Sequence, residues 1–94
     1  GALNDFSKAI DLDEKNDKAW LCRGNIMSKL NQWKDAIEDY SVAITLNSEY
    51  GMAYYNRSIA YQSAGKTNEA CADLKKSEKS GVKVDPKVKE KICR

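Results

Sequence analysis

The sequence predicts an all-α protein, a superhelical solenoid of about six antiparallel helices. Three observations support this fold class. Residues of similar size and polarity recur every 34 positions along the 94-residue chain. Within each 34-residue unit, apolar residues follow the spacing of one helix face. The chain contains one proline and five glycines, so few residues interrupt a helix.

The 34-residue period extends along almost the whole chain, and a period of this length is typical of stacked helical hairpins. A single hairpin cannot bury its apolar face, so neighbouring units must stack on one another. Small residues are expected where helices cross, and aromatic residues between them. The recurring sets are Ala2, Ala36 and Ala70; Leu3, Ile37 and Cys71; Asp5, Asp39 and Asp73; Phe6, Tyr40 and Leu74; Trp20 and Tyr54; Gly24 and Ser58; Met27 and Tyr61.

Six helices are predicted from this pattern. The third is the best defined, because Ala36, Tyr40 and Ala43 lie at positions i, i+4 and i+7 of one stripe. The first and fifth helices repeat this stripe one period earlier and later. The second and fourth helices share another stripe, which begins at Trp20 and Tyr54. The expected ranges are about 2–13, 17–30, 34–46, 51–64, 68–80 and 86–93.

Turn and capping residues separate these helices. Asn31 and Gly65 lie between paired stripes, and both types tolerate the left-handed backbone that ends a helix. Asp85–Pro86 indicates a capping side chain followed by proline at the first helical position. Further capping side chains are expected at Asn16, Ser48 and Thr67.

Composition excludes several classes of function. The formal charge is +2, from 16 basic and 14 acidic residues, far from the basic footprint of a nucleic-acid-binding protein. No apolar run approaches the roughly 20 residues that span a bilayer, and residues 1–5 resemble no signal peptide. Histidine is absent, which removes the commonest general base and metal ligand. We therefore expect no cofactor, no metal, no nucleic acid and no membrane insertion.

Catalysis is not expected either. No nucleophile–base pair, phosphate-binding loop or metal cluster is recognisable. The recurring carboxylates Asp5, Asp39 and Asp73 are interpreted as equivalent outer positions in separate units. The sequence therefore predicts that the chain is not an enzyme.

The repeat unit resembles the tetratricopeptide repeat. Residues 17–50 are similar to one complete repeat, through Trp20, Gly24 and Met27 and then Ala36, Tyr40 and Ala43. Residues 51–84 resemble a second copy. Residues 1–16 resemble the second helix of a truncated repeat, and residues 85–94 a capping helix or the start of another repeat. The proline usual near the end of a repeat is absent, with serine and valine at positions 48 and 82.

This resemblance implies a protein–protein interaction module, because the first helix of each repeat in the family lines a concave surface that binds peptides. The expected partner is a protein or peptide of unknown identity, held on a scaffold. By position, the predicted groove residues are Lys18, Leu21, Asn25, Lys29, Met52, Tyr55, Asn56, Ile59 and Gln62.

Apolar residues outside the core stripe require a covering partner. One interpretation is a bound peptide whose backbone is fixed by Asn25 and Asn56. The alternatives are a contact with another helix or a second copy, or plain exposure. Self-association is the competing function, since the first helix leaves Leu3, Phe6 and Ile10 partly uncovered, and a homo-oligomer could bury them.

The resemblance also suggests a specific ligand mode, the clamp that grips a terminal carboxylate with basic residues and asparagines. The runs at residues 23–25 and 56–58 are similar to parts of this clamp. Leu21, however, occupies a position where the clamp needs lysine. The further cations would come from the following repeat, which is only a stub here.

The cysteines and the C-terminal tail allow more than one interpretation. Cys71 occupies the position of Ile37 one unit later, on the face that packs against the next helix. A Cys71–Cys93 disulfide would attach the terminal helix and imply an oxidising compartment, whereas two unlinked thiols are the alternative. The run at residues 70–76 also resembles the last repeat of bacterial envelope proteins, with the cytoplasm as the other location. The basic tail at 82–94 suits either an acidic partner or a solvated cap.

Overall fold

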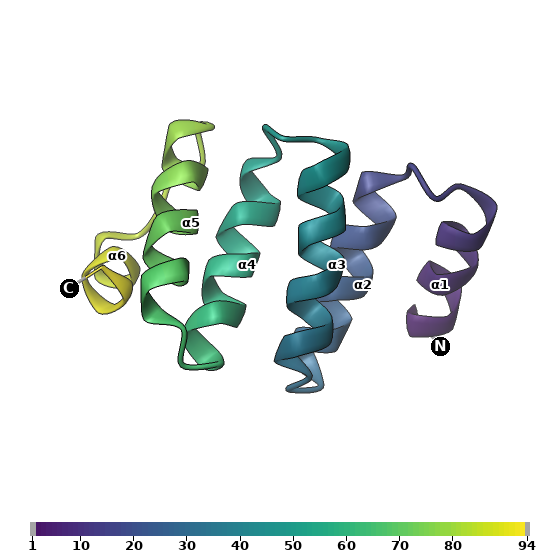
Figure 1. Ribbon diagram of the computed structural model, residues 1–94, viewed down its shortest axis with the longest axis horizontal. Helices are drawn as coiled ribbons and strands as arrows, with labels where there is room; N and C mark the ends of the chain where they lie inside the picture. The colour runs from purple at the N-terminus through teal and green to yellow at the C-terminus, as the bar shows by residue number, and fades with distance from the viewer. Residues whose placement is uncertain (1, 94) are drawn as a thin grey trace.

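The computed structural model describes residues 2–93, which form six α-helices and no strand (Figure 1). Every predicted helix is present, and its bounds agree with the expected range to within one residue. The helices are α1 (Ala2–Leu12), α2 (Asp17–Lys29), α3 (Trp33–Leu46), α4 (Gly51–Ser63), α5 (Thr67–Lys79) and α6 (Pro86–Ile92).

Most of the predicted helix ends are confirmed. Asn31 and Gly65 have φ angles of 60° and 80°, the left-handed conformation that ends a helix. The side chains of Asn16 and Asp85 accept hydrogen bonds from the first turns of α2 and α6. The predicted caps Ser48 and Thr67 are wrong, because α4 and α5 follow Tyr50 and Lys66 without a side-chain cap.

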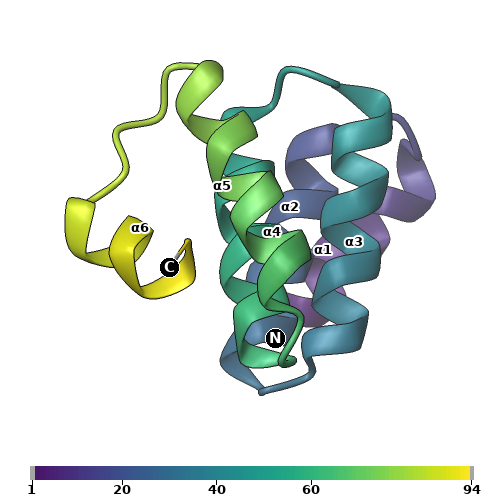
Figure 2. The same cartoon turned by 60° about the vertical axis from the view of Figure 1, so that its left-hand side comes forward.

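Helices α1 to α5 stand side by side along an elongated body measuring 40 × 25 × 18 Å (Figure 1). Contacts are most extensive within the hairpins α2–α3 and α4–α5, and α3 joins the two hairpins by packing against α4. The last helix, α6, lies across α5 after an extended connection (Figure 2). The expected division into units at 1–16, 17–50, 51–84 and 85–94 stays a prediction.

The core is built from small and large side chains that alternate between helices. Ala36, Ala43 and Ala53 are fully buried and allow close helix approach. Gly24 faces the ring of Tyr40, since a Cβ atom at Gly24 would lie 2.6 Å from Tyr40 Cε1. A second cluster contains Ala70, Leu74 and Ile92, so that it joins α5 to α6.

A buried ion pair is repeated in the two hairpins, and it corrects the sequence interpretation. Arg23 on α2 binds both carboxylate oxygens of Asp39 on α3 at 2.9 Å. Its counterpart Arg57 binds Asp73 on α5 at 2.6 and 2.8 Å. Both aspartates are buried, so their prediction as outer positions is wrong. Arg23 and Arg57 each lie 16 residues before their aspartate. Asp5 is exposed, and the given sequence contains no residue at the corresponding earlier position.

Each arginine also contacts the helix before its own. Arg23 donates to Ser7 Oγ on α1 at 3.5 Å, and Arg57 donates to Ser41 Oγ on α3 at 3.1 Å. The hydrogen bond to its aspartate raises the pKa of each guanidinium. Both arginines therefore remain charged. The network fixes α2 and α4, the helices that carry the candidate site.

Candidate interaction surface

A hollow of about 420 Å³ lies between α2 and α4, and we call it the α2–α4 groove. Its lining combines a polar centre with exposed apolar side chains. Met52 and Ile59 are 47% and 39% exposed, although they are large apolar residues. The lining residues are Asn25, Ser28, Lys29, Tyr40, Met52, Asn56 and Ile59.

Hydrogen bonds orient the two asparagines at the centre of the α2–α4 groove. Asn25 Oδ1 accepts from the Tyr40 hydroxyl at 2.6 Å and from Asn56 Nδ2 at 2.9 Å. Ser28 Oγ lies 3.1 Å from the same hydroxyl. Burial raises the pKa of Tyr40, so its hydroxyl keeps its proton at neutral pH. Both acceptor sites of Asn25 Oδ1 are therefore occupied.

The amide nitrogen of Asn25 and the amide oxygen of Asn56 remain available to a ligand. Within residues 2–93, no hydrogen bond is formed by Asn25 Nδ2 or by Asn56 Oδ1. A side-chain amide has two donor hydrogens and an acceptor oxygen. The pair thus presents an N–H group and a carbonyl oxygen to a molecule in the groove.

A second hollow of about 240 Å³ adjoins the first at Ile59, and we call it the α4–α6 hollow. Helix α6 forms one wall of it through Val88, Lys91 and Ile92, and Gln62 and Ser63 of α4 form the other. The oxygen of Gln62 is buried without a hydrogen-bond partner among the described residues. A buried acceptor without a donor is unfavourable, so a ligand N–H group would stabilise it.

The structure brings most of the predicted groove residues together. Those in the α2–α4 groove are Asn25, Lys29, Met52, Asn56 and Ile59, and Gln62 lies in the α4–α6 hollow. Lys18 is exposed but lines neither hollow. Tyr55 is half-buried and packs against the cluster of α5 and α6.

Leu21 is a wrong prediction, because it is buried in the core. Helix α2 packs against α1, α3 and α4, so it buries more than one stripe of side chains. Tyr40, Ser28 and Val88 were missed as lining residues. The signal available for Tyr40 was its hydroxyl, since a buried tyrosine usually finds a hydrogen-bond partner.

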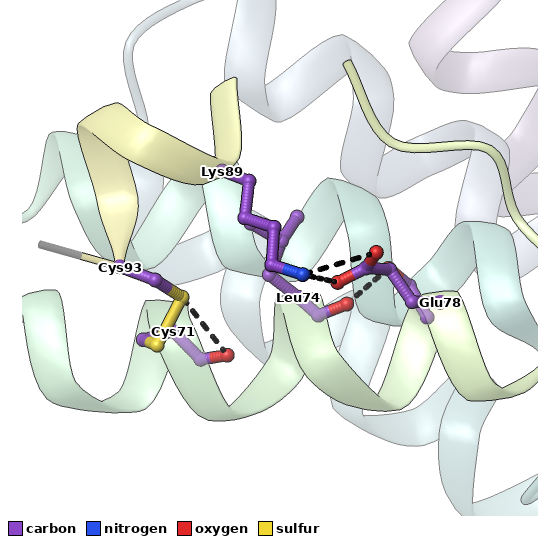
Figure 3. Close-up of a disulfide and its surroundings, with 6 residues drawn as sticks. Cys71, Leu74, Glu78, Lys89 and Cys93 are labelled. Atoms are coloured by element: carbon purple, nitrogen blue, oxygen red, sulfur yellow. Dashed lines mark hydrogen bonds and ion pairs between the residues drawn. A yellow bond between two sulfur atoms is a disulfide. The ribbon is translucent and has the colours of Figure 1, made fainter. Parts of the chain in front are cut away.

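A disulfide joins Cys71 on α5 to Cys93 at the end of α6 (Figure 3). The two Cα atoms lie 5.0 Å apart, within the range that a disulfide spans. Lys89 Nζ on α6 lies 3.1 Å from Glu78 Oε1 on α5. Figure 3 shows this ion pair next to Leu74. Cys22 is a free cysteine.

A larger hollow of about 550 Å³ lies away from the groove, between the α3–α4 turn and the end of α5. Its charged residues Glu49, Lys76 and Lys79 are exposed. Lys76 Nζ lies 5.5 Å from the ring of Tyr54. Exposed lysines around an open depression do not define a ligand site, and this hollow is a surface feature.

The stacked hairpins, with a groove between their first helices, define a helical-repeat protein. A family model described as "Tetratricopeptide repeat" matches residues 6–38. The chain belongs to the tetratricopeptide repeat family. This chain therefore has the fold of a protein–protein interaction module.

Individual proteins are similar over most of the chain. The DnaJ homolog subfamily C member 7 of Mus musculus is 35% identical over 75 residues, which cover 76% of this chain and 15% of that protein. The chain therefore spans about 15% of that curated relative's length. None of the helices within residues 2–93 is long and apolar enough to cross a membrane.

Solved structures share the fold. The first tetratricopeptide domain of Spaghetti (RPAP3), bound to the HSP90 peptide SRMEEVD, is 24% identical with a TM-score of 0.92, covering 97% of this chain and 74% of that one. The Arabidopsis OM64 tetratricopeptide domain is 25% identical with a TM-score of 0.90, covering 98% and 77%. These matches extend over α6, so they cover both hollows.

Proposed function

We propose that this chain binds an unfolded or helical segment of another protein in the α2–α4 groove, as a scaffold for that partner. The observation that carries the proposal is the donor–acceptor pair of Asn25 and Asn56 beside the exposed side chains of Met52 and Ile59. A polar centre flanked by exposed apolar groups is the arrangement that peptide-binding surfaces use.

The chemistry of a peptide matches this centre. Each residue of a peptide carries one backbone N–H and one C=O group. Asn25 Nδ2 can donate to the carbonyl, and Asn56 Oδ1 can accept from the N–H. The Tyr40 hydroxyl holds Asn25 in place before the peptide arrives, so little conformational entropy is lost on binding.

Apolar side chains of the peptide supply most of the affinity. Met52 and Ile59 lie on the same face of α4, seven residues apart, and each exposes a large part of its surface. Covering apolar surface is worth about 25 cal/mol per Å². We expect peptides with one or two large apolar residues, spaced to reach Met52 and the α4–α6 hollow.

A terminal carboxylate is not the expected anchor. Spaghetti's first domain is bound to a peptide that ends in acidic and apolar residues. In this chain Arg23 and Arg57 bind buried aspartates, and Leu21 is buried where the clamp needs a lysine. The α2–α4 groove retains Lys29 as its basic residue, which favours an internal peptide segment as the ligand.

The proposal is tested with a peptide selected from a random 12-residue display library against the oxidised chain. Its affinity for the double variant Met52→Ala plus Ile59→Ala is expected to fall at least about 10-fold, by loss of buried apolar area. The matched control is Leu46→Ala, because Leu46 is 39% exposed, as Ile59 is, but lies on α3 outside the groove. Equal affinity for both variants would contradict the proposal.

Self-association is the second candidate, and one observation favours it. Leu12 at the end of α1 is 90% exposed. The predicted uncovered surface of α1 is smaller than expected, however, since Ile10 is buried. Light scattering at increasing protein concentration separates the two functions. A strict monomer at high concentration would exclude self-association and leave the groove proposal unaffected.

A further inference from the structure

Helix α6 forms one wall of the α4–α6 hollow, yet few interactions hold it. It has seven residues, and an isolated helix of about two turns is not stable in water. Its apolar contact with α5 is small: Ile92 is buried with Leu74 and Ala70, and Val88 packs partly buried against the same cluster. The Lys89–Glu78 ion pair has side chains 50% and 34% exposed, so it contributes little.

We propose that the Cys71–Cys93 disulfide is a reducible latch that holds α6 on α5 and so sets the shape of the α4–α6 hollow. This inference rests on the proposed function only for its effect on binding. The position of α6 itself is decided independently of any ligand.

Cys71 and Cys93 are only partly buried, so the disulfide lies outside the closed core, where a reductant can approach it. The reductant is a dithiol. One of its thiolates attacks a sulfur of the disulfide, and the S–S bond breaks to give a mixed disulfide and one free thiol. The second thiol of the reductant then displaces the other cysteine. Two electrons and two protons pass to Cys71 and Cys93, and the reductant becomes a disulfide.

Loss of this bond removes a constraint between residues 22 positions apart. Because Val82 stays in place, the segment that the bond closes is about eleven residues long, and closing it raises the population of the docked state by about 100-fold in the chain-entropy account. Reduction is therefore expected to shift α6 from a docked to a largely detached state. Detachment would remove Val88, Lys91 and Ile92 from the wall of the α4–α6 hollow.

The release is confined to α6 by the segment before it. Val82 packs on Gly51, since a Cβ atom at Gly51 would lie 2.6 Å from Val82 Cγ2. Val82 N also donates to Ser77 O at the end of α5. Neither contact depends on the disulfide, so α4 and α5 keep their positions when α6 leaves.

The test is amide hydrogen exchange of the full chain carrying Cys22→Ser, in oxidised form and after treatment with dithiothreitol. Intact mass first verifies the bond, since the oxidised chain must be two hydrogens lighter. Protection of the α6 amides is expected to fall at least about 10-fold on reduction, with α2 to α5 unchanged. In the control variant Cys71→Ser plus Cys93→Ser, the protection of the α6 amides should equal that of the reduced chain and should not change on addition of dithiothreitol.

Several outcomes would overturn the latch. These are an oxidised mass equal to the reduced mass, equal α6 protection in both states, or a double serine variant that resembles the oxidised chain. The 12-residue peptide selected on the oxidised chain tests the effect on binding, and its affinity should change at least about 5-fold on reduction. If Met52→Ala plus Ile59→Ala leaves the affinity unchanged, the groove assignment fails, whereas the exchange experiment still decides the latch.

Discussion

The hairpins α2–α3 and α4–α5 share one scaffold but present different surfaces to the groove. Asn25 in the first corresponds to Ile59 in the second, and Tyr40 corresponds to Leu74 at the same 34-residue interval. The first hairpin therefore contributes Asn25 and the Tyr40 hydroxyl to the polar centre, which Asn56 of the second hairpin completes. The second contributes an apolar residue at the equivalent place. The repeat fixes the backbone, and different residues at equivalent positions make one wall of the groove polar and add exposed apolar side chains to the other.

A second pair of positions shows how each hairpin accommodates its own side chains. Gly24 leaves room for the ring of Tyr40. In the next hairpin the counterparts are Ser58 and Leu74, both fully buried. On the first helix of the hairpin, Ser58 is larger than Gly24. On the facing helix, Leu74 is smaller than Tyr40. A change in size at one position is thus accompanied by the opposite change at the other.

The repeated ion pairs also differ. The side chain of Arg57 is 17% exposed, against 23% for Arg23. Arg57 lies over the rings of both Tyr54 and Tyr61, whereas Arg23 lies over Trp20. The pair in the second hairpin is therefore more enclosed, and its loss should have the larger effect.

Removing one carboxylate from each pair gives the largest expected effect. Asp73→Ala leaves the Arg57 charge without its partner in the interior and should lower the free energy of unfolding by about 3 kcal/mol. Asp39→Ala should cost about 2 kcal/mol because Arg23 is more exposed. Urea unfolding measures both. Asp5→Ala is the control, since Asp5 is exposed at the equivalent position, and it should change stability by less than about 0.5 kcal/mol. Three equal values would contradict the comparison.

The size exchange predicts an effect of intermediate magnitude. Gly24→Ser places new atoms against the Tyr40 ring and should cost about 2 kcal/mol. In the background Tyr40→Leu, the same change should cost at least about 1 kcal/mol less, because the smaller side chain leaves space. The double-mutant cycle is measured by thermal or urea unfolding. Additivity within about 0.5 kcal/mol would show that the two positions are not coupled.

The smallest effect on stability is expected from Tyr40→Phe, which removes the hydroxyl that holds Asn25. One lost hydrogen bond costs about 1 kcal/mol. Peptide affinity should fall roughly 5-fold, because Asn25 is no longer oriented. The matched control is Tyr54→Phe, since the Tyr54 hydroxyl donates to Ser48 O outside the groove. Fluorescence anisotropy with the selected peptide measures both variants, and equal affinities would contradict the role of Tyr40.

The sequence was sufficient for the helices and much of the groove. The period identified equivalent residues, so Asn25, Met52, Asn56 and Ile59 were predicted to share one surface, and they line one hollow. The period did not predict burial where burial depends on contacts between helices. Leu21 lies on a helix enclosed by three others.

The burial of Asp39 and Asp73 follows from an arginine 16 residues earlier on another helix. That spacing matches no period of a helix or strand. It recurs in both hairpins, and this recurrence was the signal that could have revealed the pairs. The orientation of α6 across α5 could not be predicted, because residues 85–94 contain too few positions to test against the repeat.

Each arginine links three successive helices, its own and the two that its guanidinium hydrogen-bonds. The two sets overlap on α3, which holds both Asp39 and Ser41. A force that pulls the ends of the body apart would therefore load both arginines through one helix. The helices of one hairpin could not separate under tension without straining the hydrogen bonds of the other hairpin. Under an optical trap, the segment from α1 to α5 should extend in a single rupture rather than hairpin by hairpin.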